Sequence, residues 1–395
     1  MLAYALVSTL ISEDRSATRQ GMRLLAEVAH KYEIPMTWAI DAMAARAFAN
    51  DLTGWHESHA DEVLLMLDIE PLWQTEADLN DPRQSAEHTV TMREKIPQHI
   101  MGEWEKVQRA LPWARPIVAG ARFKNAVLLH ALNQVGFKGV WGYRPEQIRE
   151  DEGCPFGVFY PSADRHHFCG SPSSRVVAMP YAADDMLLAD FLASQGKLAD
   201  YLDSLAYNPW LAYTQHIEAT QVREATPEQI GQLDAYFASI REGDNANPQT
   251  LVDAVLGHRQ TTEQTLPTCL LTTRAGVKLA YYDLDCQLYF DEGDLTPTRV
   301  INYVSPPINS RSGAEFNLPQ LEQFRPSRSR SRLQMAFTIE STKAMPYGLA
   351  IWGNHAGLLL DKTNAQAVKW LGERLLFVRV DLEPGRNTVE VTLTI

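Results

Sequence analysis

Short apolar runs separated by amphipathic stretches occupy about the first 260 residues of this chain. Such runs are typical of parallel strands covered on both faces, and the stretches between them carry apolar residues at helical spacing, as in Met22, Leu25, Val28 and Tyr32. The helix that contains these four residues is predicted to be capped by Ser16. The pattern therefore predicts the α/β class and a seven-stranded (β/α) barrel. Its strands are expected at residues 6–11, 36–40, 63–67, 117–121, 140–143, 176–180 and 211–215.

The pattern changes near residue 262, where apolar and polar residues begin to alternate. Alternation marks strands with one face in solvent, and it recurs at residues 278–290, 333–339 and 375–381. The last two predicted strands are joined by Glu383-Pro-Gly-Arg-Asn387, a composition typical of a hairpin turn. We therefore predict two domains, a barrel over residues 1–261 and an antiparallel β-sandwich over residues 262–395.

The composition limits the classes of partner. The chain has 395 residues, a formal net charge of −13 and 45% hydrophobic residues, which is typical of a soluble globular protein. Nucleic acid is not an expected partner, because binding to phosphates needs a basic surface and acidic residues outnumber basic ones. The one dense basic run, at residues 325–332, is interpreted as a solvated loop between strands.

The amino-terminal run and the cysteines bear on location. Residues 1–11 are apolar but lack the cationic start and cleavage site of a signal peptide, and we interpret them as the first strand. No other segment approaches the roughly 18 apolar residues of a membrane span. Cys154, Cys169, Cys269 and Cys286 lie far apart without a C-x-x-C pair, as is usual in a reducing compartment. We therefore expect a cytoplasmic protein with no membrane partner.

Polar residues follow each predicted barrel strand. In a parallel barrel the loops after the strands meet at one end, so residues distant in sequence are expected to share one site. A single acid after a strand is ordinarily a helix cap, which is the competing interpretation of Asp41. The candidates are Glu13, Asp14, Asp41, Asp68, Glu70, Arg122, Tyr143, Arg144, Glu146, Gln147, Tyr181, Asp184, Asp185, Gln215, His216 and Glu218.

This set of acids suits hydrolysis of a glycosidic bond. One carboxyl group protonates the leaving oxygen, and a second, about 5–9.5 Å away, acts as base or nucleophile. The long loop after the fifth strand is rich in Gly, Pro and aromatic residues, which is typical of substrate-binding loops, and it contains Glu146. We predict that Glu146 is the general acid or nucleophile and that Asp14 or Asp68 is its partner. Aromatic rings near the strand ends, such as Trp141, suit the C–H faces of sugars, although about half of them are expected to pack the barrel against its helices.

Several motifs resemble those of the polysaccharide deacetylase superfamily, which shares a seven-stranded (β/α) barrel. Residues 23–38, which end in Ile34-Pro-Met-Thr-Trp38, are similar to the family's first helix and second strand. Asp61-Glu-Val-Leu-Leu-Met66 is similar to its third strand, and residues 128–137 are similar to the helix before the fifth. The resemblance covers roughly residues 3–240 and implies a carbohydrate esterase or a related glycoside hydrolase.

Part of the family's site carries over to this chain. Glu13-Asp14 is similar to the tandem acids of the first strand, of which one acts as base and the other binds a divalent metal. Arg122 is similar to the family's arginine after the fourth strand, and His216 to the histidine of its last strand.

The family's two metal-binding histidines do not carry over. Met66, Leu67 and Asp68 stand where those histidines follow the third strand, whereas His56 and His59 precede it and are interpreted as surface or structural residues. Oxygen ligands alone suit zinc poorly, since zinc favours imidazole and thiolate. We therefore expect no metal cofactor and a metal-independent mechanism.

Three functions remain open from the sequence. The first is a metal-independent, glycoside-hydrolase-like enzyme acting on an oligosaccharide or polysaccharide; the second is a de-N-acetylase with a divalent metal ion; the third is a barrel that binds glycans without chemistry. The predicted catalytic residues are Glu146, Asp14, Asp68 and His216, and the predicted substrate-binding residues are Glu13, Asp41, Glu70, Arg122, Trp141, Tyr143, Arg144, Tyr181 and Gln215.

Overall fold

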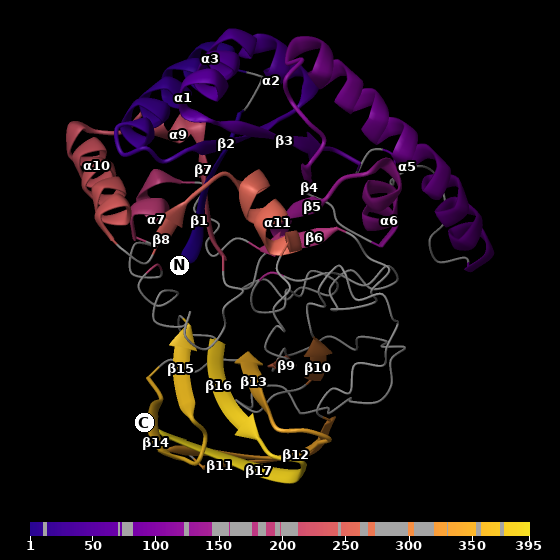
Figure 1. Ribbon diagram of the computed structural model, residues 1–395, viewed down its shortest axis with the longest axis vertical. Coiled ribbons are helices and arrows are strands. Elements are labelled where there is room, and N and C mark those ends of the chain that lie inside the picture. Colours follow the sequence, from indigo (N-terminus) through magenta and orange to yellow (C-terminus); the bar gives the residue numbers. More distant parts are fainter. Residues whose placement is uncertain are drawn as a thin grey trace.

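The computed structural model describes most of the first domain and part of the second (Figure 1). The described residues are 1–10, 14–69, 72, 82–121, 126–143, 158, 176–180, 187–193, 198, 212–243, 246–260, 268–272, 299–303, 320–329, 331–352, 357–371 and 375–395.

A parallel sheet forms the core of the first domain. Its strands lie in the order β6-β5-β4-β3-β2-β1-β7, and the short strand β8 pairs with the start of β1. The two end strands of this order, β6 and β7, are in contact, so the sheet is a nearly closed barrel. The predicted seven-stranded barrel is therefore confirmed. The seven barrel strands are β1 (Leu2–Thr9), β2 (Met36–Ile40), β3 (Glu62–Leu67), β4 (Val118–Ala121), β5 (Gly139–Tyr143), β6 (Val177–Pro180) and β7 (Ala212–Glu218), and the additional short strand is β8 (Ala246–Pro248).

Helices cover the outside of the barrel (Figure 1). Each strand therefore buries both faces, and β1 is an example: Tyr4 and Leu6 pack under the helices, while Ala5 and Val7 face the barrel lumen. The covering helices are α1 (Arg15–His30), α2 (Ala42–Ala47), α3 (Ala49–His59), α5 (Pro82–Ala110), α6 (Ala126–Val135), α7 (Leu188–Ala193), α9 (Ala219–Arg223) and α10 (Pro227–Glu242).

The closest helix contact in this layer joins α1 to α9. An ideal Cβ on Gly21 of α1 would lie 1.8 Å from the carbonyl oxygen of Ala219 in α9. Met22 and Leu25 on α1 are fully buried beside it. The two helix backbones can approach this closely because residue 21 has no side chain.

A further helix, α11 (Leu251–Gln260), lies across the N-terminal end of the lumen. The backbone N–H of Leu251 donates to Oγ1 of Thr37, near the start of β2, at 2.8 Å. An ideal Cβ on Gly139, the first residue of β5, would lie 2.7 Å from Cγ2 of Val255. Both α11 residues belong to the cluster that fills the lumen. This helix therefore closes the N-terminal end of the barrel.

Two sheets form the second domain, which is a β-sandwich as predicted. One has the order β10-β9-β13-β16-β15 and the other β11-β12-β17-β14; all described neighbours are antiparallel except β9 and β13. Phe337, Leu349, Val378 and Val391 are fully buried in the core that the two sheets share. The strands are β9 (Thr268–Thr272), β10 (Arg299–Tyr303), β11 (Gln320–Ser329), β12 (Arg332–Ser341), β13 (Met345–Trp352), β14 (Leu359–Thr363), β15 (Ala367–Leu371), β16 (Leu375–Leu382) and β17 (Gly385–Thr394).

The interpretation of residues 325–332 as a loop is wrong. Most of this basic run lies in β11, which pairs with β12 at the edge of its sheet. Among the described strands β11 lies at the edge of its sheet, a position that tolerates the exposed Arg325 and a proline at residue 326.

Other predictions fall outside the described residues. The strand expected at 278–290 is one of them. Barrel elements end at Gln260 and sandwich strands begin at Thr268, so the boundary at 261/262 stays a prediction. No helix in the described part of the chain combines the length and apolar character needed to cross a membrane.

Candidate active site

The C-terminal end of the lumen brings together side chains from β1, β5 and β7. Inward positions alternate along a strand, so Thr9 follows Val7 into the lumen and His216 follows Ala212. Nε2 of His216 is 2.6 Å from Oγ1 of Thr9. The His216 ring also lies edge-on to Trp141, with ring centroids 5.1 Å apart. Two residues predicted for the site, Trp141 and His216, are thus in contact.

The bond between Thr9 and His216 joins a hydroxyl to an imidazole. His216 is 6% exposed, whereas Thr9 is half-buried at the last position of β1. Neutral imidazole has one donor and one acceptor nitrogen, and a hydroxyl can both donate and accept, so either group can be the donor of this bond. The sequence prediction omits Thr9, which lies inside the predicted first strand at residues 6–11; the two-residue alternation along β1 is the signal that finds it.

Gly120 of β4 makes room for this arrangement. An ideal Cβ on Gly120 would lie 2.5 Å from Sδ of Met66 and 3.2 Å from Cε3 of Trp141. Sδ of Met66 therefore occupies the space that a side chain on residue 120 would take, and the Trp141 ring borders that space.

A groove of about 480 Å³ lies beside the carboxyl ends of β2 and β3, between α2 and α5. Asp41 and Asp68 follow these two neighbouring strands, and the structure brings both to the groove. Oδ1 of Asp41 accepts from the Ala44 N–H at 2.6 Å, so Asp41 caps α2, while Asp68 is exposed. Charged residues of α2 and α5 complete the groove, and the sequence prediction misses them because they lie on helices. The lining residues are Asp41, Ala42, Met43, Arg46, Met66, Asp68, His99, Glu103 and Lys106.

Asp14 lies at the amino end of α1. Its Oδ1 accepts from the backbone N–H of Ala17 at 2.9 Å, and its side chain is exposed. The cap of α1 is therefore Asp14, and the prediction that Ser16 caps this helix is wrong, because Ser16 already lies in the first turn. A catalytic role of Asp14 stays a prediction.

Gln215 lies on the opposite face of β7 from His216. It is fully buried, and its Oε1 accepts from the hydroxyls of Tyr4 at 2.8 Å and Tyr236 at 2.7 Å. Successive side chains of a strand point to opposite faces, so Gln215 faces the helix layer. Substrate binding by Gln215 stays a prediction to which this position lends no support.

The remaining predicted residues lie outside the described part of the chain, and their roles stay predictions. They are Glu13, Glu70, Arg122, Arg144, Glu146 and Tyr181; for Tyr143 only the backbone is described.

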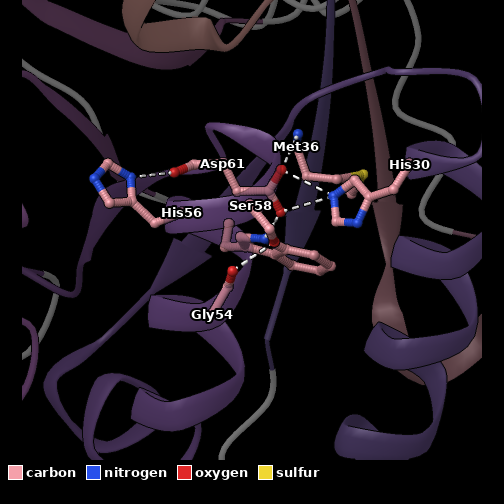
Figure 2. A network of polar contacts seen from close by, with 7 residues as sticks. His30, Met36, Gly54, His56, Ser58 and Asp61 are labelled. Carbon is pink, nitrogen blue, oxygen red and sulfur yellow. Dashed lines mark hydrogen bonds and ion pairs between the residues drawn. The ribbon is translucent and has the colours of Figure 1, made fainter.

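A second polar cluster lies at the opposite, N-terminal end of the barrel (Figure 2). Asp61, directly before β3, is 1% exposed and accepts from the Met36 N–H at 2.9 Å and from Nε1 of Trp38 at 2.8 Å. Nε2 of His30 is 2.9 Å from Oδ1 of the same carboxylate, and Nδ1 of His56 is 2.8 Å from the Asp61 carbonyl oxygen. Asp61 therefore joins α1, α3, β2 and β3.

His56 and His59 both lie in this cluster, away from the mouth of the barrel. His56 stacks on Trp113 with ring centroids 3.9 Å apart, and His59 stacks on His30 at 3.8 Å. Burial and the neighbouring His30 imidazole lower the pKa of His59.

The donor groups at the mouth do not fit the zinc site that the family resemblance implies. β3 ends in Met66 and Leu67, and a carboxylate follows, where the resemblance calls for two imidazoles. Asp14, the other candidate ligand, already accepts a helix N–H. Within the described ranges, no three His, Cys, Asp or Glu side chains gather to hold a metal ion.

Comparisons with known proteins add similarity of fold only. No family model and no curated protein matches the sequence. A solved structure named as a polysaccharide deacetylase from Mycobacterium smegmatis is 11% identical with a TM-score of 0.46, over 70% of this chain and 95% of that one. An allantoinase is 13% identical with a TM-score of 0.45, over 66% of this chain and 91% of that one. A family 4 carbohydrate esterase from Streptomyces lividans is 8% identical with a TM-score of 0.32, over 60% and 89%.

The strand order and the helix layer define a (β/α)-barrel protein with polar side chains at the C-terminal mouth. Identities of 13% and below do not determine a reaction. The chemistry has to be argued from the side chains themselves.

Proposed function

We propose that this chain is a carbohydrate-active hydrolase that cleaves glycosidic bonds at the C-terminal mouth of its barrel without a metal ion. The observation that carries the proposal is the position of Asp68, which follows β3, is exposed and shares a groove with Asp41. His216 and Trp141 lie in the lumen at the same end. A glycan lying across this end would meet the exposed carboxylate of Asp68 beside Asp41.

Asp68 supplies one of the two carboxyl groups that glycosidic hydrolysis requires, and Glu146 is the predicted second. One protonates the leaving oxygen while the other attacks the anomeric carbon or activates water. Asp41, held in place by its bond to the N–H of Ala44, is suited to accept a sugar hydroxyl. A carboxylate pair needs no Lewis acid, which agrees with donor groups that fit zinc poorly.

The test compares Glu146→Gln and Asp68→Asn with the wild-type chain on aryl glycosides and oligosaccharides. We expect each variant to lower the rate by about 10²–10⁴-fold, the usual contribution of an acid–base group. Asp51→Asn is the matched control, because Asp51 pairs with Arg19 and Arg23 on the outside of the barrel. It is expected to keep the wild-type rate.

Other outcomes of the same assay point to the other functions. Wild-type rates in both variants would reject the carboxylate mechanism. Activity that a chelator removes and a divalent ion restores, with acetate as the product, would indicate a metal-dependent de-N-acetylase. Glycan binding without any product would indicate a binding protein.

A further inference from the structure

The groove between α2 and α5 has its charges arranged in order along its length. Its mouth end carries the carboxylates of Asp41 and Asp68, which directly follow β2 and β3. α2 starts at this end and runs away from it, so Arg46, in its last turn, lies farther from the mouth. α5 leads back to the start of β4, so Lys106, in its C-terminal part, also lies away from the mouth. The groove is therefore acidic at the mouth and has Arg46 and Lys106 at its far end.

Within the described ranges, one of these two cations is already paired and the other is not. Nζ of Lys106 is 2.6 Å from Oε1 of Glu103, one turn earlier on α5. Arg46 is exposed and forms no ion pair with any residue that the structure describes. Together these three side chains leave the far end with one net positive charge. That charge is a guanidinium, whose planar fork of donors fits a carboxylate at two points.

The rest of the groove suits a sugar chain. Met43 is 57% exposed and lines the groove beside Ala42 and Met66, so apolar surface is available to the C–H faces of a sugar ring. His99 is half-buried, and its ring nitrogens can bond to sugar hydroxyls. Seven residues of α5 separate His99 from Lys106, a rise of about 10 Å. The groove is therefore longer than one sugar ring.

We propose that this groove selects glycans that carry a carboxylate, such as uronic acids, and that Arg46 binds the carboxylate. The proposal rests on the proposed function, because it makes the groove a subsite for the glycan cleaved beside Asp68. One net positive charge at the far end matches the single charge of a carboxylate, whereas a phosphate monoester carries about two. The whole chain has a net charge of −13 and repels anions, so an anionic glycan needs a local cation to hold it.

The experiment measures binding of uronate tetramers to the full chain by calorimetry, in the cold so that turnover is slow. Tetramers of galacturonate, glucuronate and mannuronate are each compared with their methyl ester, which has the same sugars and linkage but no charge. The wild-type chain is expected to bind at least one acid about 10–100-fold more tightly than its ester, the usual effect of charge-assisted hydrogen bonds. Arg46→Gln is expected to abolish this preference, and Arg46→Lys, which keeps the charge without the fork, to retain part of it.

Arg109→Gln is the matched control. It changes the net charge by the same amount on α5, but Arg109 is 76% exposed and lies outside the groove. This variant is expected to bind acid and ester as the wild type does. Equal binding of acid and ester by the wild type for all three sugars, or an Arg46→Gln variant that keeps the preference, would overturn the proposal. A neutral tetramer with one sulfate that bound more tightly than every uronate would overturn the choice of carboxylate.

Failure of the proposed function gives a different result. If the wild-type chain preferred the acid through Arg46 but cleaved no glycan, glycosidic hydrolysis would be rejected and the carboxylate subsite supported. If it cleaved neutral glycans and showed no preference for any acid, the subsite would be rejected and the proposed function would stand.

Discussion

Replacing Asp61 with alanine is expected to destabilise the barrel by about 3–5 kcal/mol. The carboxylate accepts from the backbone of Met36, from Nε1 of Trp38 and from the ring of His30. Met36 and Trp38 are fully buried, so water cannot replace the lost acceptor. Each buried donor without an acceptor costs about 1–3 kcal/mol, so two to three such donors give about 2–9 kcal/mol, and the stated range is the usual cost of removing one partner of a buried charged pair.

Urea unfolding followed by tryptophan fluorescence measures this change, because Trp38 lies in the affected cluster. Asp51→Ala is the matched control: it also removes a carboxylate that binds two side chains, but those arginines are 44% and 60% exposed. Its expected cost is no more than about 1 kcal/mol. If Asp61→Ala lowered the free energy of unfolding no more than Asp51→Ala does, the argument from buried donors would be refuted.

Three further predictions concern stability. Gly21→Ala is expected to lower the free energy of unfolding by about 1–3 kcal/mol, because the new Cβ would overlap the backbone of α9. Gly54→Ala on α3 is its control: no atom lies within 4 Å of the new Cβ, so this change should raise the free energy of unfolding by about 0.5–1 kcal/mol in the same urea assay. Gln215→Leu removes the oxygen that accepts from the buried hydroxyls of Tyr4 and Tyr236 and is expected to cost about 1–3 kcal/mol; unchanged stability would argue against the bonds described. Burial and the adjacent Arg259 lower the pKa of His258 from 6.5 to about 4. As the pH falls, this imidazole is therefore protonated at a higher pH in the unfolded chain than in the folded one. The free energy of unfolding of the wild-type chain should therefore fall as pH falls from 6.5 towards 4. In His258→Gln the free energy of unfolding should fall less between about pH 7 and about pH 5. An equal pH dependence of the two chains would contradict the lowered pKa of His258.

Apolar runs predict the barrel well because its strands bury both faces, and β2 begins and ends at the predicted residues. The sequence pattern ends β7 at residue 215, whereas the strand continues through His216 to Glu218. A hydropathy pattern counts a histidine as exposed, but the lumen of the barrel encloses the hydrogen-bonded imidazole of His216. β11 is missed for the opposite reason, since an exposed edge strand carries little apolar signal.

The candidate site is only partly predictable from sequence. Position after a strand identifies Asp41 and Asp68, and both line one groove. The same rule cannot separate Gln215 from His216, which are adjacent in the chain yet face the helices and the lumen, respectively. The strand register and the side of the sheet that faces inward decide which of the two side chains enters the lumen, and both depend on the closure of the whole barrel.

The position of β1 inside the sheet has a consequence for synthesis. This strand leaves the ribosome about 200 residues before its partners β7 and β8. At 5–20 residues per second, the edge of β1 that pairs with β7 waits roughly 10–40 s for its neighbour. Until then the nascent chain presents an open, apolar strand edge, of the kind that pairs with other chains. A chaperone that covers this edge until about residue 250 has been made would protect the yield of folded protein.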